Sequence, residues 1–109
     1  MDTLLAPVVS ALTEHYPNEK PAHVERAYLV AKEAHAGQLR KSGEEYITHP
    51  VAVAGILAEL GLNEATIIAA LLHDTVEDTA YSLAQLRKDF GEEIALLVDG
   101  VTKLDKLTY

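Results

Sequence analysis

Hydrophobic residues recur at three- and four-residue steps along most of this 109-residue chain, which is the spacing of one face of an α-helix. No segment resembles the apolar-polar alternation of paired strands. The pattern therefore predicts an all-α fold. The first helix should end before Pro17. Its apolar stripe comprises Leu4, Leu5, Val8, Val9 and Leu12.

Helix-boundary residues divide the pattern that follows. Pro21 suits the first turn of a second helix, and Gly37 ends that helix. Pro50 is predicted to open a third helix, which Gly61 closes. Residues 37–49 (GQLRKSGEEYITH) mix glycine, charge and β-favouring residues without a period, so we expect them to form a long loop.

Three more helices are predicted in the second half of the chain. Asn63 is a favourable N-cap for the fourth helix. Ser82 and Gln85 form a capping box for the fifth, which Gly91 ends. Apolar residues from Ile94 onward predict a sixth helix.

The apolar pattern of the sixth helix still continues at Leu107, with no proline or polar tail to finish it. Domains rarely end in this way. We therefore expect residues 1–109 to be one domain, the N-terminal part of a longer protein whose later helices complete the core. The apolar helix faces left exposed predict self-association, for example by exchange of helices.

Composition narrows the candidate functions. The 17 acidic residues outnumber the 9 basic ones, and the resulting net charge of −8 disfavours nucleic-acid binding. Because the chain has no cysteine, a metal site would need histidine and carboxylate ligands. No apolar run approaches the roughly 18 residues of a membrane span, and the N-terminus lacks the basic flank of an export signal. These features predict a cytoplasmic, soluble protein.

The segment ALLHDTVEDT, residues 70–79, gathers an imidazole and several carboxylates on one helix. Glu77 follows His73 by four residues, and Asp78 follows Asp74 by four, so their side chains form one patch. The carboxylates oppose the helix macrodipole and repel one another, and no lysine or arginine occurs between residues 42 and 86. A divalent cation would neutralise them. The alternative is a solvated acidic helix end with His73 as a core histidine.

His49 adds a second part to this candidate site. Because Pro50 follows it, we expect His49 to be extended at the helix entrance, with the direction of its ring fixed. With His73 and Asp74 it makes a three-ligand set for Mn, Fe or Zn that leaves positions open for water. Alternatively, His49 only caps the third helix.

Five segments together resemble the N-terminal hydrolase domain of the Rel/Spo alarmone enzymes, which belong to the HD superfamily of metal-dependent phosphohydrolases. They follow one another in the right order and spacing between residues 24 and 107. The segments are 35–44 (HAGQLRKSGE), 46–50 (YITHP), 69–79 (AALLHDTVEDT), 90–91 (FG) and 100–104 (GVTKL).

This resemblance implies an HD fold that removes pyrophosphate from the 3′ position of guanosine tetra- or pentaphosphate and yields GDP or GTP. The implied cofactor is Mn²⁺, or another divalent cation. The resemblance assigns metal binding to His49, His73 and Asp74. It assigns activation of the attacking water to Glu77 and Asp78.

The same resemblance assigns the guanine nucleotide to a loop that contains Arg40, Lys41 and Ser42, whose alternative role is that of solvated loop residues. Two other functions stay open: a nucleotide-sensing module without hydrolysis, and an HD phosphohydrolase of another nucleotide. The acidic pair at residues 77 and 78 disfavours the first, and the basic loop disfavours the second. Long members of the family can also synthesise the alarmone.

The chain departs from the family in one respect. HD enzymes complete the metal site with an aspartate on a later helix, which in the Rel/Spo group lies beyond the last residue of this chain. Asp99 and Asp105 do not fit that motif. His35 lies on the apolar face of the second helix and should make structural hydrogen bonds, whereas Tyr46 should pack in the core or beside the pocket.

Overall fold

The computed structural model describes residues 3–106, with side chains described as far as residue 103, and the regular elements within this range are helices. Its helices are α1 (Ala6–His15), α2 (Ala22–Ala34), α3 (Thr48–Glu59), α4 (Glu64–Asp78), α5 (Leu83–Phe90) and α6 (Glu92–Lys106). The described residues contain no strand, only an isolated bridge between Leu39 and Glu45. The all-α prediction is confirmed.

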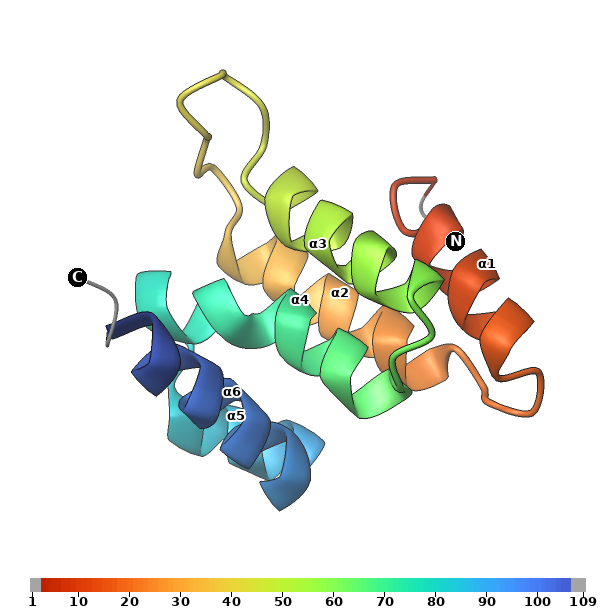
Figure 1. Cartoon of the computed structure of the whole chain (residues 1–109). Coiled ribbons are helices and arrows are strands. Elements are labelled where there is room, and N and C mark those ends of the chain that lie inside the picture. The colour runs from red at the N-terminus through yellow and green to blue at the C-terminus, as the bar shows by residue number, and fades with distance from the viewer. Residues whose placement is uncertain (1–2, 107–109) are drawn as a thin grey trace.

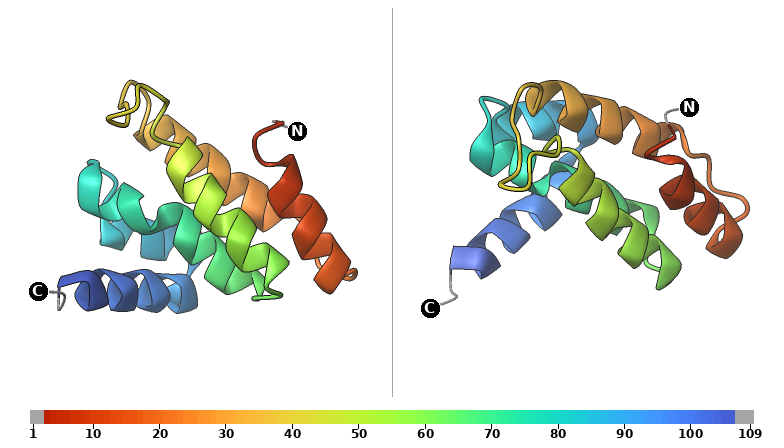
Figure 2. Two further views of the ribbon diagram at one scale, coloured as in Figure 1. Left: turned by 45° about the horizontal axis from the view of Figure 1, so that its top comes forward. Right: turned by 90° about the horizontal axis from the view of Figure 1, so that it is seen from above.

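Helix α4 lies at the centre of the fold (Figures 1 and 2). It packs against α2, α3 and α6, while α1 packs on α3 and α5 packs on α6. Its buried residues are Ile67, Ile68, Ala69, Leu71, Leu72 and Thr75. Because α4 also carries residues 73–78, the candidate site is built on the most enclosed helix, and its backbone is held from several sides.

Two predicted N-caps are formed. Asn63 accepts a hydrogen bond from the Thr66 backbone N–H at 3.0 Å, and Ser82 accepts one from Gln85 at 3.1 Å. The side chain of Gln85 does not return to Ser82 as a full capping box requires. It donates instead to both carboxylate oxygens of Asp89, at 3.0 and 3.1 Å. Only one half of the predicted capping box is therefore present.

The conformation predicted for His49 is wrong. Helix α3 begins at Thr48, so His49 and Pro50 both lie in its first turn and His49 is helical. The chain is already wound before the proline, because Thr48 N–H donates to Glu45 O at 3.1 Å and His49 N–H to Tyr46 O at 3.0 Å. Pro50 fits there since the first turn of a helix leaves its N–H groups without an intrahelical acceptor.

The predicted loop lies between α2 and α3, and Figure 1 shows it in yellow, extending away from the helices. Backbone hydrogen bonds close it: Arg40 N–H donates to Glu44 O and Gly43 N–H to Arg40 O, both at 2.8 Å. Gly43 has φ +92°, which a residue with a side chain rarely adopts. Residues 40–44 of the loop therefore form a tight turn.

Two helix faces carry exposed apolar side chains. Ile56 on α3 and Leu60 at its C-cap are 60% and 71% exposed, and Leu97 and Val101 on α6 are 37% and 40% exposed. Self-association through such faces stays a prediction. The side chain of Asp105 and all of Leu107 lie outside the described residues. None of the described helices combines the length and apolar character needed to cross a bilayer.

Candidate metal centre

Three potential ligands lie together near the C-terminal end of α4. His73 Nδ1 lies 3.2 Å from Asp74 Oδ1, and His73 Nε2 lies 3.2 Å from Glu77 Oε2. One donor atom from each residue falls within 4.8 Å of the others. Helix geometry produces the cluster, because residues one and four positions apart can both reach a point beside the same turn.

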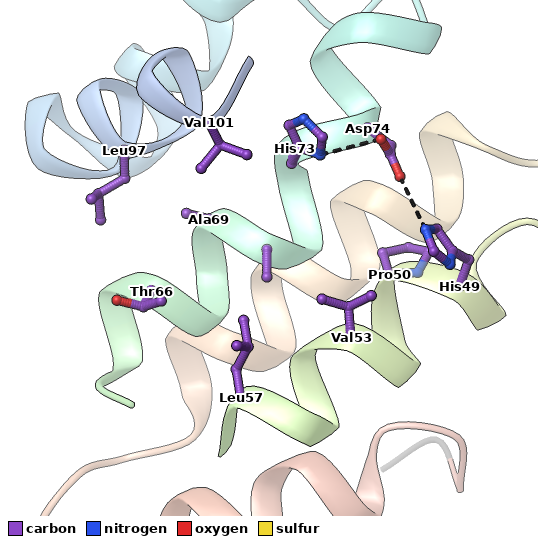
Figure 3. A pocket seen from close by; sticks show the side chains of 11 residues that line it. His49, Pro50, Val53, Leu57, Thr66, Ala69, His73, Asp74, Leu97 and Val101 are labelled. Carbon is purple, nitrogen blue, oxygen red and sulfur yellow. Dashed lines mark ion pairs between the residues drawn. The ribbon is translucent and has the colours of Figure 1, made fainter. Parts of the chain in front are cut away.

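His49 approaches this cluster from the first turn of α3. Its Nε2 lies 3.9 Å from Asp74 Oδ2, on the opposite side of the carboxylate from His73. Figure 3 shows Asp74 between the two imidazoles, with a dashed line to each. The structure therefore brings together His49, His73 and Asp74, but His49 reaches the cluster through Asp74 and lies outside the tight group with Glu77.

The residues present fit a divalent cation. Imidazole nitrogen and carboxylate oxygen are ligands that Mn, Fe and Zn accept. Bonds of about 2.1 Å to one ion require donor atoms within about 4.2 Å of one another, so small side-chain movements would close the observed cluster around an ion. The donor set does not select one metal, because these three metals share the same ligand types.

Tyr46 contacts the cluster more directly than the sequence indicated. Its hydroxyl donates to Asp74 Oδ2 at 3.0 Å and lies 3.5 Å from Asp78 Oδ2. Burial and the neighbouring Asp74 and Asp78 carboxylates raise the pKa of Tyr46 to about 12, so the hydroxyl remains a proton donor at neutral pH. The sequence signal that could have found it is its position three residues before His49.

His35 has the structural role predicted for it. The residue is 3% exposed, and its Nδ1 lies 2.9 Å from Gln38 Oε1 while its Nε2 lies 3.2 Å from Thr75 Oγ1. Its ring lies against the Tyr46 ring, with centroids 4.6 Å apart and the two planes tilted by 31°. Thr75 is fully buried directly after Asp74, so this polar pair joins α2 to the helix that carries the cluster.

The predicted nucleotide-binding residues line a separate, open depression of about 570 Å³. Arg40, Lys41 and Ser42 are all exposed there, and Ser42 Oγ donates to Glu44 Oε1 at 3.2 Å. Tyr46 also lines this depression. The structure thus groups the three residues on one turn, and Tyr46 connects that turn to the carboxylates of α4.

An apolar cavity of about 210 Å³ lies on another side of the cluster, between α3, α4 and α6 (Figure 3). His73 and Asp74 form part of its wall. The remaining wall is mostly hydrocarbon, from Pro50, Val53, Leu57, Ala69, Ala70, Leu97 and Val101. The cluster therefore has one polar side, toward the turn, and one apolar side.

Comparison with known families matches residues 27–109 to the HD domain. The chain is 65% identical over 86 residues to a GTP pyrophosphokinase of Streptomyces coelicolor, which is 79% of the chain and 10% of that protein. It is 57% identical over 104 residues to a probable GTP pyrophosphokinase of Mycobacterium leprae, which is 95% of the chain and 13% of that protein.

A third similar protein is the bifunctional (p)ppGpp synthase/hydrolase SpoT of Escherichia coli. The identity is 53% over 95 residues, which is 87% of the chain and 14% of that protein. The chain therefore spans only 10 to 14% of the length of these relatives.

Proposed function

The chain belongs to the HD domain family, and from this we propose that it forms part of a hydrolase domain that acts on guanosine tetra- and pentaphosphate. The reaction removes pyrophosphate from the 3′ position and gives GDP or GTP, in the cytoplasm. The observation that carries this proposal is the cluster of His73, Asp74 and Glu77 next to a turn with two adjacent basic residues. A relative is named a (p)ppGpp synthase/hydrolase, which supports this substrate class.

His49, His73 and Asp74 would hold the cation, and we propose Mn²⁺ for it. When bound, a divalent cation supplies Lewis-acid polarisation of the phosphoryl oxygens. Asp74 has a central part because its two oxygens face different partners, His73 on one side and His49 with Tyr46 on the other. A carboxylate in this position keeps both imidazoles oriented toward one region.

Glu77 and Asp78 would handle the proton of the attacking water. Water adds to the phosphorus attached to the 3′ oxygen, the bond between this phosphorus and the 3′ oxygen breaks, and the proton that water loses passes by way of the acidic pair to the 3′ oxygen, which leaves as a hydroxyl. Glu77 is exposed and already lies beside His73, so its carboxylate can accept the proton that water loses. Asp78 is exposed one residue further along α4, and its Oδ2 lies 3.5 Å from the Tyr46 hydroxyl.

Arg40, Lys41 and Ser42 would bind the nucleotide. In a protein of net charge −8, a polyphosphate is attracted only where positive side chains gather, and the turn supplies two of them. The planar guanidinium of Arg40 can stack on the purine or hold phosphate, and Lys41 adds a compact positive charge. This turn favours a guanosine 3′-diphosphate over other nucleotides as the substrate.

Anion-exchange chromatography of guanosine 3′,5′-bis(diphosphate) incubated with Mn²⁺ and the longer protein tests the proposal. GDP and pyrophosphate should appear, and His73→Ala or Asp74→Ala should abolish them. Undiminished turnover by both variants would reject the site. Nucleotide binding without turnover in the wild type would instead favour a sensing module. Relatives named GTP pyrophosphokinase indicate a synthetic activity as well, which we assign to other parts of the longer protein.

A further inference from the structure

Tyr46 connects two places that the proposed function uses separately. Its side chain lines the depression formed by Arg40, Lys41 and Ser42. Its hydroxyl donates to Asp74 Oδ2 at 3.0 Å. A change in the conformation of the turn can therefore alter the position of a metal-cluster residue, Asp74, through the side chain of Tyr46.

The position of Tyr46 is fixed by the residues around it. Its backbone N–H donates to Gln38 O at 3.0 Å, which anchors it at the base of the turn. Its ring packs at a tilt against His35, which is itself held by Gln38 and Thr75. Because the ring has little freedom, its hydroxyl presents a directed donor to α4.

The hydrogen bond to Asp74 orients a carboxylate that His73 also contacts. Asp74 Oδ2 accepts from Tyr46, and Oδ1 lies 3.2 Å from His73 Nδ1. A hydrogen bond at one oxygen restricts rotation of the carboxylate, so the other oxygen stays aimed at the space beside His73. Partners of this kind orient metal ligands, and their loss commonly weakens metal binding about 10- to 100-fold.

We propose that Tyr46 is a positioning residue that couples divalent-cation binding at α4 to ordering of the turn formed by residues 38–46. With the hydroxyl present, cation binding fixes Asp74, Asp74 holds Tyr46, and Tyr46 holds the base of the turn. By thermodynamic linkage, a ligand that orders the turn then strengthens cation binding by the same factor. The inference rests on the proposed function for its metal site, but it requires no turnover.

The chain offers a matched control for removal of this hydroxyl. Tyr81 is also half-buried, and its hydroxyl donates to the carboxylate of Asp89 at 2.6 Å. Asp89 does not belong to the His73, Asp74 and Glu77 group. Tyr46→Phe and Tyr81→Phe each remove one tyrosine–aspartate hydrogen bond, and each keeps the ring. Only Tyr46→Phe should change the affinity for the cation.

Titration of the chain with Mn²⁺, followed by the electron paramagnetic resonance signal of the free ion, measures the dissociation constant. We expect Tyr46→Phe to raise it about 10-fold and Tyr81→Phe to leave it within about two-fold of wild type. Hydrogen exchange of residues 38–46 gives the second readout. Mn²⁺ should slow exchange there in the wild type and in Tyr81→Phe, and should leave it unchanged in Tyr46→Phe.

The outcomes separate this inference from the proposed function. Mn²⁺ binding that His73→Ala abolishes but Tyr46→Phe leaves unchanged would overturn the coupling and leave the hydrolase proposal in place. The expected changes in Tyr46→Phe, found together with no alarmone turnover by the longer protein, would support the coupling and reject hydrolysis. A wild-type chain that does not bind Mn²⁺ would overturn the coupling, while turnover by the longer protein would still decide the hydrolase proposal.

Discussion

His73 Nε2 lies 3.2 Å from Glu77 Oε2, one helical turn further along α4. Because the other ring nitrogen of His73 faces Asp74, a single imidazole contacts two carboxylates. A neutral imidazole has one donor and one acceptor nitrogen, so it cannot donate to both carboxylates at once. A divalent cation that accepts an electron pair from one nitrogen of His73 would resolve this conflict, because the other nitrogen can then donate its proton to one carboxylate.

Removal of His73 or Asp74 should therefore affect Mn²⁺ binding more than removal of His49. His73→Ala and Asp74→Ala each delete a member of the tight cluster, whereas His49 Nε2 lies 3.9 Å from Asp74 and outside that cluster. We expect no detectable binding by the first two variants, and roughly 10-fold weaker binding by His49→Ala. Isothermal titration calorimetry of the three variants measures this order, and equal losses would contradict it.

Nucleotide affinity should depend on the turn. Arg40→Ala removes an exposed guanidinium in the depression that the turn forms, and we expect about 10-fold weaker binding of guanosine 3′,5′-bis(diphosphate). Arg87→Ala is the control, because Arg87 pairs with Glu92 at 2.7 Å on another surface. Equilibrium dialysis with the longer protein gives both dissociation constants. Equal affinities of the two variants for the nucleotide would show that the turn is not part of the binding site.

The buried polar pair behind the cluster should contribute to stability. Thr75→Val removes the hydroxyl that lies 3.2 Å from His35 Nε2 and leaves that nitrogen buried with one partner fewer. The free energy of unfolding should fall by about 1–3 kcal/mol. Thr13→Val, at an exposed position on α1, should change it by less than about 0.5 kcal/mol. Urea denaturation measures both, and similar values would show that the pair is not stabilising.

The core face of α4 should be sensitive to truncation. Leu71 is fully buried, and Leu71→Ala should lower the free energy of unfolding by about 2–5 kcal/mol because it removes apolar contacts and leaves a cavity. Leu29→Ala on α2 makes the same chemical change at a side chain that is 60% exposed. Thermal unfolding should show a large loss of stability for Leu71→Ala and a small loss of stability for Leu29→Ala.

Stability should also depend on pH through Asp89. Hydrogen bonds from Tyr81 and Gln85 hold the pKa of Asp89 below its usual range. A carboxyl group with a lowered folded-state pKa stabilises the protein above its unfolded pKa of about 3.9, and this contribution is lost as the pH falls through the folded value. Tyr81→Phe should therefore lower the urea midpoint at pH 7, with a smaller difference near pH 3. A difference in urea midpoint that becomes larger at acidic pH would contradict a lowered pKa of Asp89 in the folded protein.

Local features of the fold could be predicted from the sequence because each depends on a few adjacent residues. The cap at Asn63 and the apolar face of α4 are of this kind. The contact between Tyr46 and Asp74 is different, since it joins residues 28 positions apart and exists only when the loop packs against α4. His49 was mispredicted because the preference of a residue before proline was outweighed by hydrogen bonds of the preceding turn.

The hydrocarbon-lined hollow beside His73 and Asp74 has a consequence for how firmly an ion is retained. Attraction between opposite charges grows as the surrounding medium becomes less polarisable. An apolar small molecule bound between α3 and α6 would displace water from that side of the cation. Such a molecule would slow the departure of the ion, although most of its contacts would be with hydrocarbon side chains.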